Sequence, residues 1–506
     1  MGSAKNIEGE GKKHAPLLVR ELEAQPDVLL RALLRLDPAR RVSILDSNGA
    51  RPPDARFLIA GFDPFEIIEA RARTLRINRR DEEVELVEGD VLEILDERLE
   101  SYRTPHVSLP DSIPASGACI ATFSYELAQR FHRLRLKSSG RTAQSDEPDA
   151  VLAFYDTLVI HDYERGLSRL VNCGGGEHRF EQAYAVIQES IEQAASTSPE
   201  ETDIFLKAST TGGHHLLRLP LEIDGQRLTS SLTRDEYLSR IERIKEHIAA
   251  GDIYQANLTQ RLKITLDPTR TPERIFLRLR RTHPASFSAF IRRREDAVVS
   301  ASPERFLRVG WDEQKRRWIE AWPIKGTRAR GMNAAEDERL RTELRESEKD
   351  RAENVMIVDL MRNDLGRVCQ YGSVEVTELC AIQEHPTLFH LVSKVRGLLR
   401  ADVKAGELMR AAFPCGSITG APKLRAMEII DEMESAPRGL SMGAIGYFSF
   451  DGRLDLSVAI RTMTIRERTA RFNVGGGIVA DSDPALEYEE SLTKAHALLR
   501  ALSLKG

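Results

Sequence analysis

One amine occupies a position where it could act as a nucleophile. Lys325 lies in the run Trp322-Pro-Ile-Lys-Gly-Thr-Arg328, at the end of an apolar strand and directly before a glycine. An amine there would be held against the protein, and burial favours the neutral, nucleophilic form of a lysine. Position alone fits a surface lysine between a strand and a loop just as well. The surrounding residues decide between these interpretations.

A carboxyl group is expected beside this amine. Residues 302–310 and 316–324 have strand-like patterns and flank a polar turn, which predicts a hairpin. With the turn centred near Gln314, Glu304 falls almost opposite Lys325, and cross-strand neighbours lie ~5 Å apart. The pair is either a structural salt bridge or a general acid beside a nucleophile.

Two predicted helices each present a pair of acidic side chains. The first is the pattern of residues 334–365, mostly one long helix, and the second begins at Asp483, an N-cap residue followed by proline. Carboxylates on two helices can hold a hard cation such as Mg²⁺, which needs few protein ligands. A single pair is more often a solvated helix face. The pairs are spaced i, i+3, with a lysine one turn after the second: Asp350 and Glu353, then Glu487 and Glu490 followed by Lys494.

One arginine is suited to binding a carboxylate. In the predicted strand 455–461, the side chains of Leu456, Val458 and Ile460 share one face, and Arg461 points to the other. An arginine on the non-aliphatic face of a sheet can grip a carboxylate through two hydrogen bonds. Arg461 is therefore a candidate for binding an anionic substrate.

Two glycine-rich runs are candidates for backbone contacts to an anion. Residues 475–477 are three consecutive glycines, and residues 416–420 lead into a helix predicted to start at Pro422. Either run alone is equally consistent with a plain turn. His390, between Phe389 and Leu391, has the surroundings of a hydrogen-bonded core histidine rather than of a proton carrier.

Composition and charge narrow the class of protein. The 506 residues carry a net charge of −5 with both signs interspersed, which argues against a nucleic-acid or membrane surface as the main partner. Five scattered cysteines suit reduced thiols in the cytoplasm. The first 14 residues are too polar for a signal peptide, and apolar runs of about ten residues are too short to span a bilayer. We therefore expect a cytoplasmic protein.

The chain divides into two parts by composition. Residues 1–232 form an N-terminal region whose polar stretch, about 194–232, is typical of a linker, and residues 233–506 form a second domain. The second part combines long helices with hairpins, including a strong turn signal at Asp451-Gly452. Meandering strands of this kind predict an α+β fold.

Taken together, these segments resemble the chorismate-utilising enzymes. The resemblance is dense over about residues 233–502 and looser in the first part, mainly around residues 55–70. It implies the anthranilate synthase component I-like fold, a large antiparallel β-sandwich with helices packed on the outside. The matching motifs are Ser302-Pro-Glu-Arg-Phe306, Pro323-Ile-Lys-Gly-Thr-Arg328, Lys349-Asp-Arg-Ala-Glu-Asn354, Asp359-Leu-Met-Arg-Asn-Asp-Leu-Gly366, Gly416-Ser-Ile-Thr-Gly-Ala-Pro-Lys423 and residues 475–494.

Three details of these motifs resemble the aminodeoxychorismate synthase branch. Lys325 stands where anthranilate, isochorismate and salicylate synthases usually carry alanine. Met361 and the form of residues 416–420 also match that branch. The water-activating lysine of the isochorismate and salicylate enzymes would fall at Ala256, and alanine cannot deprotonate water. Ammonia, which is already basic, is the better nucleophile for such a site.

The resemblance implies a role for each candidate residue. Chorismate and ammonia would give 4-amino-4-deoxychorismate, a reaction of the transaminase class that leads to 4-aminobenzoate and folate. Lys325 would be the covalent nucleophile and Glu304 the general acid. Mg²⁺ would be held by Glu353 and Glu490, with Asp350 and Glu487 acting through water. The residues implied to bind the substrate are Arg461, Thr327, His390, Thr419, Gly420, Gly475, Gly477 and Lys494.

The source of ammonia and two rival functions follow from the same comparison. No cysteine lies in a glutaminase-like Gly-x-Cys-x-Gly elbow, so a separate glutamine amidotransferase subunit is the expected partner. The first rival is an anthranilate synthase component I, which eliminates pyruvate, and an isochorismate or salicylate synthase is less favoured. The second is a non-catalytic chorismate-binding protein, which predicts a missing acid or metal ligand. Cys415 occupies a position that is usually glycine or alanine.

Overall fold

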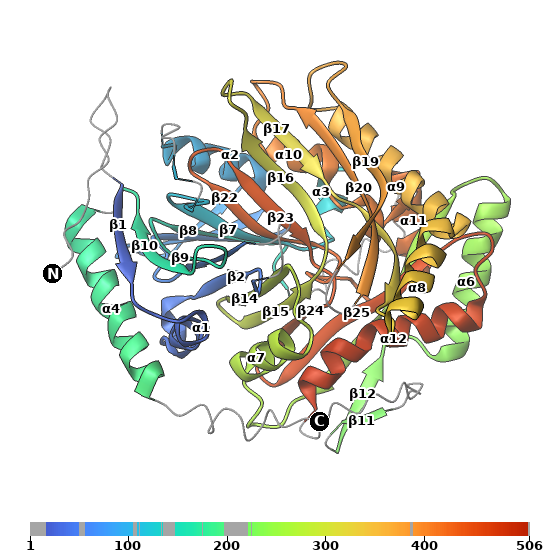
Figure 1. Cartoon of the computed structure of the whole chain (residues 1–506), viewed down its shortest axis with the longest axis horizontal. Helices are drawn as coiled ribbons and strands as arrows, with labels where there is room; N and C mark the ends of the chain where they lie inside the picture. Colours follow the sequence, from blue (N-terminus) through green and yellow to red (C-terminus); the bar gives the residue numbers. More distant parts are fainter. Residues whose placement is uncertain are drawn as a thin grey trace.

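Two antiparallel sheets form the body of the protein (Figure 1). The structure is a computed structural model that describes residues 17–49, 56–104, 109–110, 112–132, 134, 147–174, 176–196, 221–223, 225–384 and 388–503. Within these residues one sheet has 13 strands and the other has 12.

The 13-stranded sheet carries strands from both ends of the chain. In spatial order its strands are β1 (Leu18–Leu22), β10 (Leu167–Asn172), β9 (Thr157–Asp162), β3 (Phe57–Gly61), β2 (Ser43–Asp46), β14 (Phe287–Arg292), β15 (Asp296–Ser302), β24 (Thr462–Arg466), β25 (Thr469–Ile478), β13 (Gln255–Thr265), β12 (Gln226–Ser230) and β11 (Leu221–Ile223), with β21 (Gly420–Ala421) paired to β13.

The 12-stranded sheet is built in the same mixed way. Its strands in spatial order are β18 (Ile324–Ala329), β20 (Leu388–Leu398), β17 (Arg317–Ala321), β16 (Arg305–Trp311), β23 (Leu454–Val458), β22 (Ala444–Ser449), β7 (Ala118–Phe123), β8 (Ala150–Tyr155), β4 (Glu66–Arg71), β5 (Thr74–Arg79) and β6 (Glu85–Glu88), with β19 (Glu375–Glu384) paired to β20.

Helices cover the outer faces of the two sheets. Their bounds are α1 (Pro26–Arg35), α2 (Val91–Ser101), α3 (Leu127–Phe131), α4 (Gly176–Ser196), α6 (Arg234–Ala249), α7 (Pro272–Thr282), α8 (Ala334–Glu346), α9 (Glu348–Gly366), α10 (Ala405–Ala412), α11 (Lys423–Met433) and α12 (Pro484–Leu502), with short 3₁₀ turns η1 (Pro38–Arg40) and η3 (Gly416–Ile418).

Three apolar clusters explain this layering. Side chains of α1, α4, α7 and α12 pack with the 13-stranded sheet, and side chains of α2, α9 and α10 pack with the 12-stranded sheet. A third cluster joins residues of both sheets, including Ile59 and Val298 from one and Ile120 and Ile445 from the other, so the sheets face each other. The expected α+β sandwich with external helices is therefore confirmed.

Hydrogen-bond ladders cross the expected division near residue 232. Strand β2 pairs with β14, and β7 pairs with β22, so each sheet contains strands from both parts of the chain. The division into two domains stays a prediction. Residues 197–220 of the expected linker lie outside the described residues, but β12, which falls in its last part, pairs with β13.

Two continuous strand-like runs and one predicted helix are divided in the structure. The apolar run 151–160 is two strands separated at Asp156, and the chain passes there from one sheet to the other. The run 454–465 is likewise split into β23 and β24. Residues 334–365 form two helices rather than one, because Ser347 ends α8 and caps α9 by accepting a hydrogen bond from the Asp350 N–H (3.2 Å).

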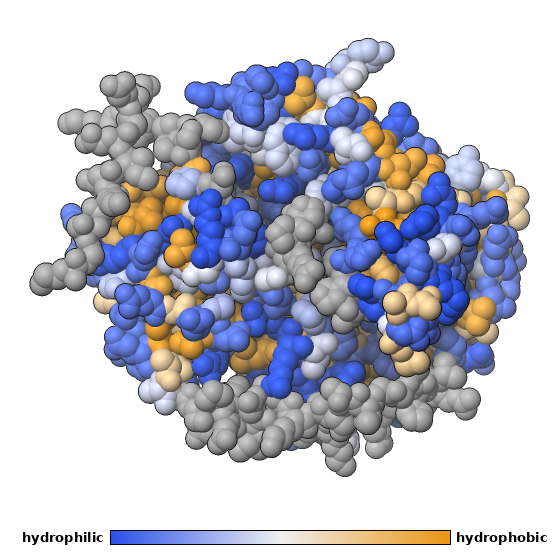
Figure 2. All heavy atoms as spheres, viewed as in Figure 1, coloured by the Kyte–Doolittle hydropathy of each residue, from blue (hydrophilic) through white to orange (hydrophobic). Residues whose placement is uncertain are grey.

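The surface shows no continuous apolar belt on the face seen in Figure 2, where hydrophilic residues surround separate hydrophobic patches. Among the described residues, no helix is long and apolar enough to cross a membrane.

Candidate functional site

A β-bulge sets the direction of the Lys325 side chain. The ladder between β18 and β20 shifts register between Ile324 and Thr327, which leaves Lys325 and Gly326 out of step with the partner strand. Gly326 has a φ of +83°, and a Cβ at this position would lie 2.9 Å from the Asp350 carboxyl carbon. Only glycine fits there without strain. The Lys325 side chain is 15% exposed, and its Nζ lies 3.7 Å from Glu353 Oε2.

Glu304 lies beside Lys325 for a reason that differs from the expected hairpin. The β16–β17 ladder runs only from Arg308 opposite Glu320 to Trp311 opposite Arg317, and β18 pairs with β20 instead. The hairpin ladder itself therefore does not contain Glu304 or Lys325. Glu304 precedes β16, and its carboxyl group interacts with the backbone N–H of Ile324 and with the Lys325 amine.

The environment of Glu304 favours a protonated carboxyl group. The side chain is buried, and its Oε1 has no hydrogen-bond partner among the described residues. Burial raises the pKa of Glu304 to about 7, against the opposing effects of the Ser417 side chain and the Lys325 amine. A carboxyl group of this kind can hold a proton at neutral pH and donate it.

The acidic pair on α9 is divided between two partners. Asp350 Oδ2 accepts a hydrogen bond from Arg328 Nη2 (3.1 Å), whereas Glu353 faces Lys325. The pair on α12 is divided in the same way. Glu487 Oε1 accepts from the Ser482 hydroxyl (2.7 Å), and Glu490 forms an ion pair with Lys494 (2.7 Å).

The pKa values of the two acidic side chains on α12 shift in opposite directions. Burial raises the pKa of Glu487, and the neighbouring Glu490 carboxylate adds to that shift. Burial alone would also raise the pKa of Glu490, but Lys494, Lys349 and Lys325 together lower it. Glu490 is therefore the carboxylate of this pair that stays charged most readily.

These carboxylates are compatible with Mg²⁺ but do not form a closed metal cage. No group of three or more metal-binding side chains gathers within the part of the chain that the structure describes. Mg²⁺ usually keeps several waters and takes one or two protein carboxylates. Glu353 lies 3.7 Å from the Lys325 amine, and the same amine contributes to lowering the pKa of Glu490 on the other helix. This donor set suits a magnesium ion completed by water and substrate.

The three glycines lie on β25, where side chains would not fit. A Cβ at Gly475 would lie 1.9 Å from the Leu258 carbonyl oxygen. A Cβ at Gly477 would lie 2.3 Å from Gln255 Nε2 and 3.5 Å from Lys325 Nζ. Lys494 Nζ donates to the Gly475 carbonyl (3.2 Å). The glycine strand therefore forms a wall of the site that contains Lys325.

Arg461 lies outside the strand that was predicted to carry it. Strand β23 ends at Val458, and Arg461 has a φ of +48° in the segment before β24. No hydrogen bond or ion pair of the described residues involves its guanidinium group, and burial lowers the pKa of Arg461. A partly buried cation without a carboxylate partner is suited to receive an anionic ligand.

The other predicted substrate-binding residues support the walls of the site. Thr327 lies opposite His390 in the β18–β20 ladder, and its hydroxyl is 2.9 Å from His390 Nδ1. His390 is buried, in agreement with a hydrogen-bonded core histidine. The Thr419 hydroxyl donates to the Cys415 carbonyl (3.0 Å), and Gly420 pairs with Ala256.

Gln255 is a residue of the site that the sequence analysis missed. It is fully buried, neither of its amide atoms has a hydrogen-bond partner among the described residues, and it lies against Gly477. Ala256 instead packs in the apolar cluster with Leu258 and Ile478. Alternation along a strand puts Gln255 on the face opposite Ala256. The sequence analysis considered Ala256, and the residue that borders the site is its neighbour along the strand, Gln255.

Cys415 is a buried, unreactive thiol in this setting. Its Sγ lies 3.3 Å from the Ser417 hydroxyl, and burial raises the pKa of Cys415 to about 12. The thiol form is therefore the dominant form at neutral pH.

The site combines a lysine amine, a protonatable carboxyl group and a glycine-rich wall, and the segment between β23 and β24 carries an arginine whose guanidinium group has no hydrogen-bond or ion-pair partner among the described residues. Such a set suits a small, polyanionic substrate. Residues 50–500 match the family model described as chorismate binding enzyme, and the chain belongs to this family.

Relatives of two kinds are similar over most of the chain. The aminodeoxychorismate synthase component 1 of Escherichia coli (strain K12) is 36% identical over 463 residues, 91% of this chain and 92% of its own length. The anthranilate synthase component 1 of a Synechocystis strain is 35% identical over 474 residues, 91% and 90%. The crystal structure of anthranilate synthase component I from Streptococcus pneumoniae matches with a TM-score of 0.71 and 26% identity, over 95% of this chain and 100% of that one.

Proposed function

We propose that this protein is the chorismate-aminating component of an aminodeoxychorismate synthase, which forms 4-amino-4-deoxychorismate and retains the pyruvyl group. The observation that carries the proposal is the placement of the Lys325 amine against Glu353 and beside the buried carboxyl group of Glu304. A family in which two amination reactions occur needs a feature that separates them. By resemblance, Lys325 is that feature.

The first covalent step needs a neutral amine and a proton donor. Lys325 Nζ attacks C2 of chorismate, both double bonds of the ring shift, and the C4–O bond breaks. Glu304, which burial keeps partly protonated near neutral pH, gives its proton to the departing hydroxyl group, which leaves as water. The carboxylate that remains can accept the proton that the attacking amine loses.

The second step reverses the electron shift. Ammonia attacks C4, both ring double bonds move back, and the C2–N bond to Lys325 breaks. Glu304 gives its proton to the departing lysine nitrogen, which restores the free amine, and takes up the proton that the added nitrogen loses. One difficult allylic displacement is thereby divided into two easier ones. Gln255, which borders both Gly477 and Lys325, can hydrogen-bond the incoming nucleophile or the ring.

The remaining residues bind the substrate's charges. The unpartnered Arg461 holds the enolpyruvyl carboxylate. Glu353 and Glu490, with Asp350 and Glu487 through water, would hold Mg²⁺, which supplies positive charge to the ring carboxylate. Lys494 and the backbone of Gly475 and Gly477 face the same group. Thr327, His390, Thr419 and Gly420 fix the walls around it.

The ammonia would come from a separate glutamine amidotransferase subunit. Several relatives are named as component 1 of a synthase, which implies a second component. We place the complex in the cytoplasm, in the route to 4-aminobenzoate and folate.

Anthranilate synthase component 1 is the second candidate, because relatives of that name are 31–35% identical over most of the chain. The two functions differ in the product formed from chorismate, Mg²⁺ and ammonium. A mass-spectrometric assay should detect 4-amino-4-deoxychorismate without release of pyruvate. Fluorescent anthranilate together with pyruvate would instead establish the second candidate.

A further inference from the structure

Arg438 is a buried cation that none of the roles above uses. The side chain is 2% exposed, and it follows helix α11 at the start of the segment that leads into β22. Its Nε and Nη2 donate to the two carboxylate oxygens of Glu434 (2.9 and 2.7 Å), and its guanidinium carbon lies 4.4 Å from the centre of the Tyr125 ring. Charge, hydrogen bonds and an aromatic face therefore fix this side chain in one position.

Two carbonyl groups at the site accept its remaining hydrogen bonds. Arg438 Nη1 donates to the Ile418 carbonyl (2.8 Å), and Nη2 donates to the Asn257 carbonyl (2.6 Å). The Asn257 N–H in turn donates to the Thr419 carbonyl (2.7 Å). One guanidinium group thus joins the η3 turn to the site-facing strand β13. A guanidinium spans two such acceptors, and an ammonium group at the same place does not.

The segment held in this way contacts the general acid. Ser417 directly precedes Ile418, and its side chain interacts with the Glu304 carboxyl group. The η3 turn has no side-chain cap, and its hydroxyl neighbours, Ser417 and Thr419, bond mainly within the turn. The contacts of Arg438 and Asn257 hold this turn against β13, next to the short ladder that pairs Gly420 and Ala421 with the same strand.

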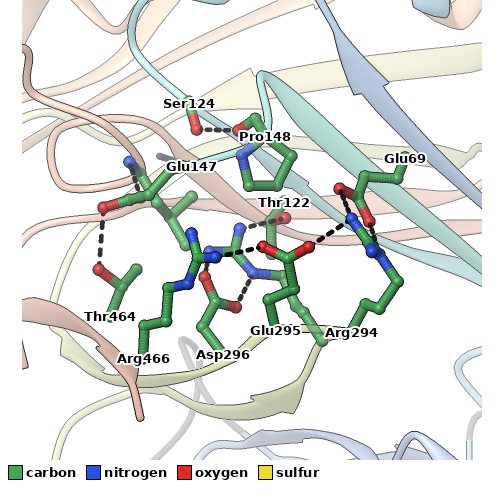
Figure 3. A network of polar contacts seen from close by, with 12 residues as sticks. Glu69, Thr122, Ser124, Glu147, Pro148, Arg294, Glu295, Asp296, Thr464 and Arg466 are labelled. Carbon is green, nitrogen blue, oxygen red and sulfur yellow. Dashed lines mark hydrogen bonds and ion pairs between the residues drawn. The ribbon is translucent and has the colours of Figure 1, made fainter. Parts of the chain in front are cut away.

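The backbone of Arg438 is anchored from the N-terminal part of the chain. Glu126 accepts hydrogen bonds from the N–H groups of Arg438 (2.6 Å) and Gly439 (2.9 Å). Glu147 accepts from the Leu440 N–H (2.9 Å) and also from the Thr464 hydroxyl (2.9 Å), the contact shown in Figure 3. A Cβ at Gly439 would lie 2.8 Å from Glu147, so the fit around this anchor is tight.

We propose that Arg438 is a positioning residue for the general acid: held by Glu126 and Glu434, it fixes the η3 turn so that the Ser417 side chain orients Glu304 toward the substrate. The inference rests on the proposed role of Glu304 but not on which product forms. A displacement of about 1 Å at a catalytic group can lower the rate by ~100-fold. Loss of the Arg438 contacts should therefore reduce turnover although Arg438 touches no substrate.

A double-mutant cycle tests this path. Consumption of chorismate is measured with Mg²⁺ and ammonium for the full-length wild type, Arg438→Lys, Ser417→Ala and the double variant. We expect Arg438→Lys to lower kcat by about 10- to 100-fold, with a small change in KM. In the Ser417→Ala background the same change should cost less than about threefold, because the linked contact is already lost. Equal losses in both backgrounds would overturn the proposal.

A pH profile separates positioning from general damage. The groups that face Glu304 are Lys325 on β18, the Ile324 N–H, Ser417 in η3 and Cys415 directly before η3. The Ser417 interaction lowers the pKa of Glu304, so its loss should raise that pKa. In both Arg438→Lys and Ser417→Ala, the fall of kcat/KM on the basic side of the profile should therefore occur at higher pH when free ammonia is held constant. An unchanged limb in Arg438→Lys would contradict the proposal.

The controls use another buried arginine and a milder change. Arg293 is fully enclosed and donates to both oxygens of Asp296 (2.6 and 2.6 Å), so Arg293→Lys disturbs a matched ion pair on another strand connection. It should lower thermal stability without moving the pH limb. If Arg438→Lys does not fold, Glu434→Gln takes its place in the cycle. This change removes the negative charge that holds Arg438 and keeps one side-chain oxygen that can accept a hydrogen bond from it. A wild type that consumes no chorismate would instead refute the proposed function.

Discussion

Lys325 and Glu353 meet at 3.7 Å, although one lies on the edge strand β18 and the other in the first turns of α9. The contact depends on the bulge at Gly326, which lets the lysine leave the ladder toward the helix. It places the proposed nucleophile directly beside a proposed metal ligand.

Replacement of Lys325 by alanine tests the covalent role. Lys325→Ala should lower the formation of 4-amino-4-deoxychorismate by orders of magnitude, because the displacement loses its nucleophile. Binding of chorismate should stay largely intact, since Arg461 and the acidic residues remain. Product is measured by mass spectrometry and binding by calorimetry. Unaffected turnover would show that the covalent role is wrong.

The proposed role of Glu304 as general acid gives a pH-dependent prediction. Burial raises the pKa of Glu304 to about 7, so the protonated fraction falls as the pH rises through 7. We expect kcat to fall on that side when free ammonia is held constant, and Glu304→Gln to lose about 10²- to 10⁴-fold in kcat. The profile of the wild type is compared with that of Glu21→Gln, an exposed acid on β1. A wild-type profile that rises steadily from pH 6 to 9 would contradict this role.

Stability should depend on pH in the same range. Burial raises the folded-state pKa of both Glu126 and Glu304 to about 7, above the ordinary value of 4.5. Between these values the folded state binds more protons than the unfolded state, so the free energy of unfolding falls as the pH rises from about 5 to 8. Urea unfolding of Glu126→Gln and Glu304→Gln should show a weaker fall than the wild type. A steeper fall in these variants would contradict the assignment.

Much of the fold could be predicted because its signals are local. The cap at Asp483 and the hairpin turn at Asp451-Gly452 lie at their predicted positions. The division of the runs 151–160 and 454–465 could not be predicted, because both halves of each run are buried and apolar. Only the pairing of strands into different sheets distinguishes them.

Some residues of the site could be predicted from the sequence, and others could not. Spacing along a helix singled out Glu353 and Glu490, and the structure brings Glu353 to Lys325 and pairs Glu490 with Lys494. Gln255 was missed because strand alternation gives the face only when the register is known. Arg438 was missed for another reason: its acceptors are backbone carbonyls of distant segments, and no sequence pattern marks a carbonyl.

Removal of the metal ligands tests the Mg²⁺ site. Glu353→Gln and Glu490→Gln should each weaken Mg²⁺ binding in the presence of chorismate by about 10- to 100-fold, because each removes a charged oxygen. Calorimetric titration of Mg²⁺ into the protein with chorismate measures the affinity. The matched control is Glu181→Gln. Glu181 lies on helix α4 and pairs with Arg20, and its change should leave the Mg²⁺ affinity unchanged. Wild-type affinity in both site variants would exclude these ligands.

The glycine wall gives a steric prediction. Gly477→Ala would put a methyl group 2.3 Å from Gln255 Nε2 and 3.5 Å from Lys325 Nζ, so Gln255 must move into the space beside the lysine. We expect kcat/KM to fall by at least about 100-fold while the protein stays folded. Gly366→Ala is the control, because an added Cβ there meets no atom within 4 Å and the residue lies at the end of α9. If Gly477→Ala retains full activity, Gln255 and this strand do not border the reacting atoms.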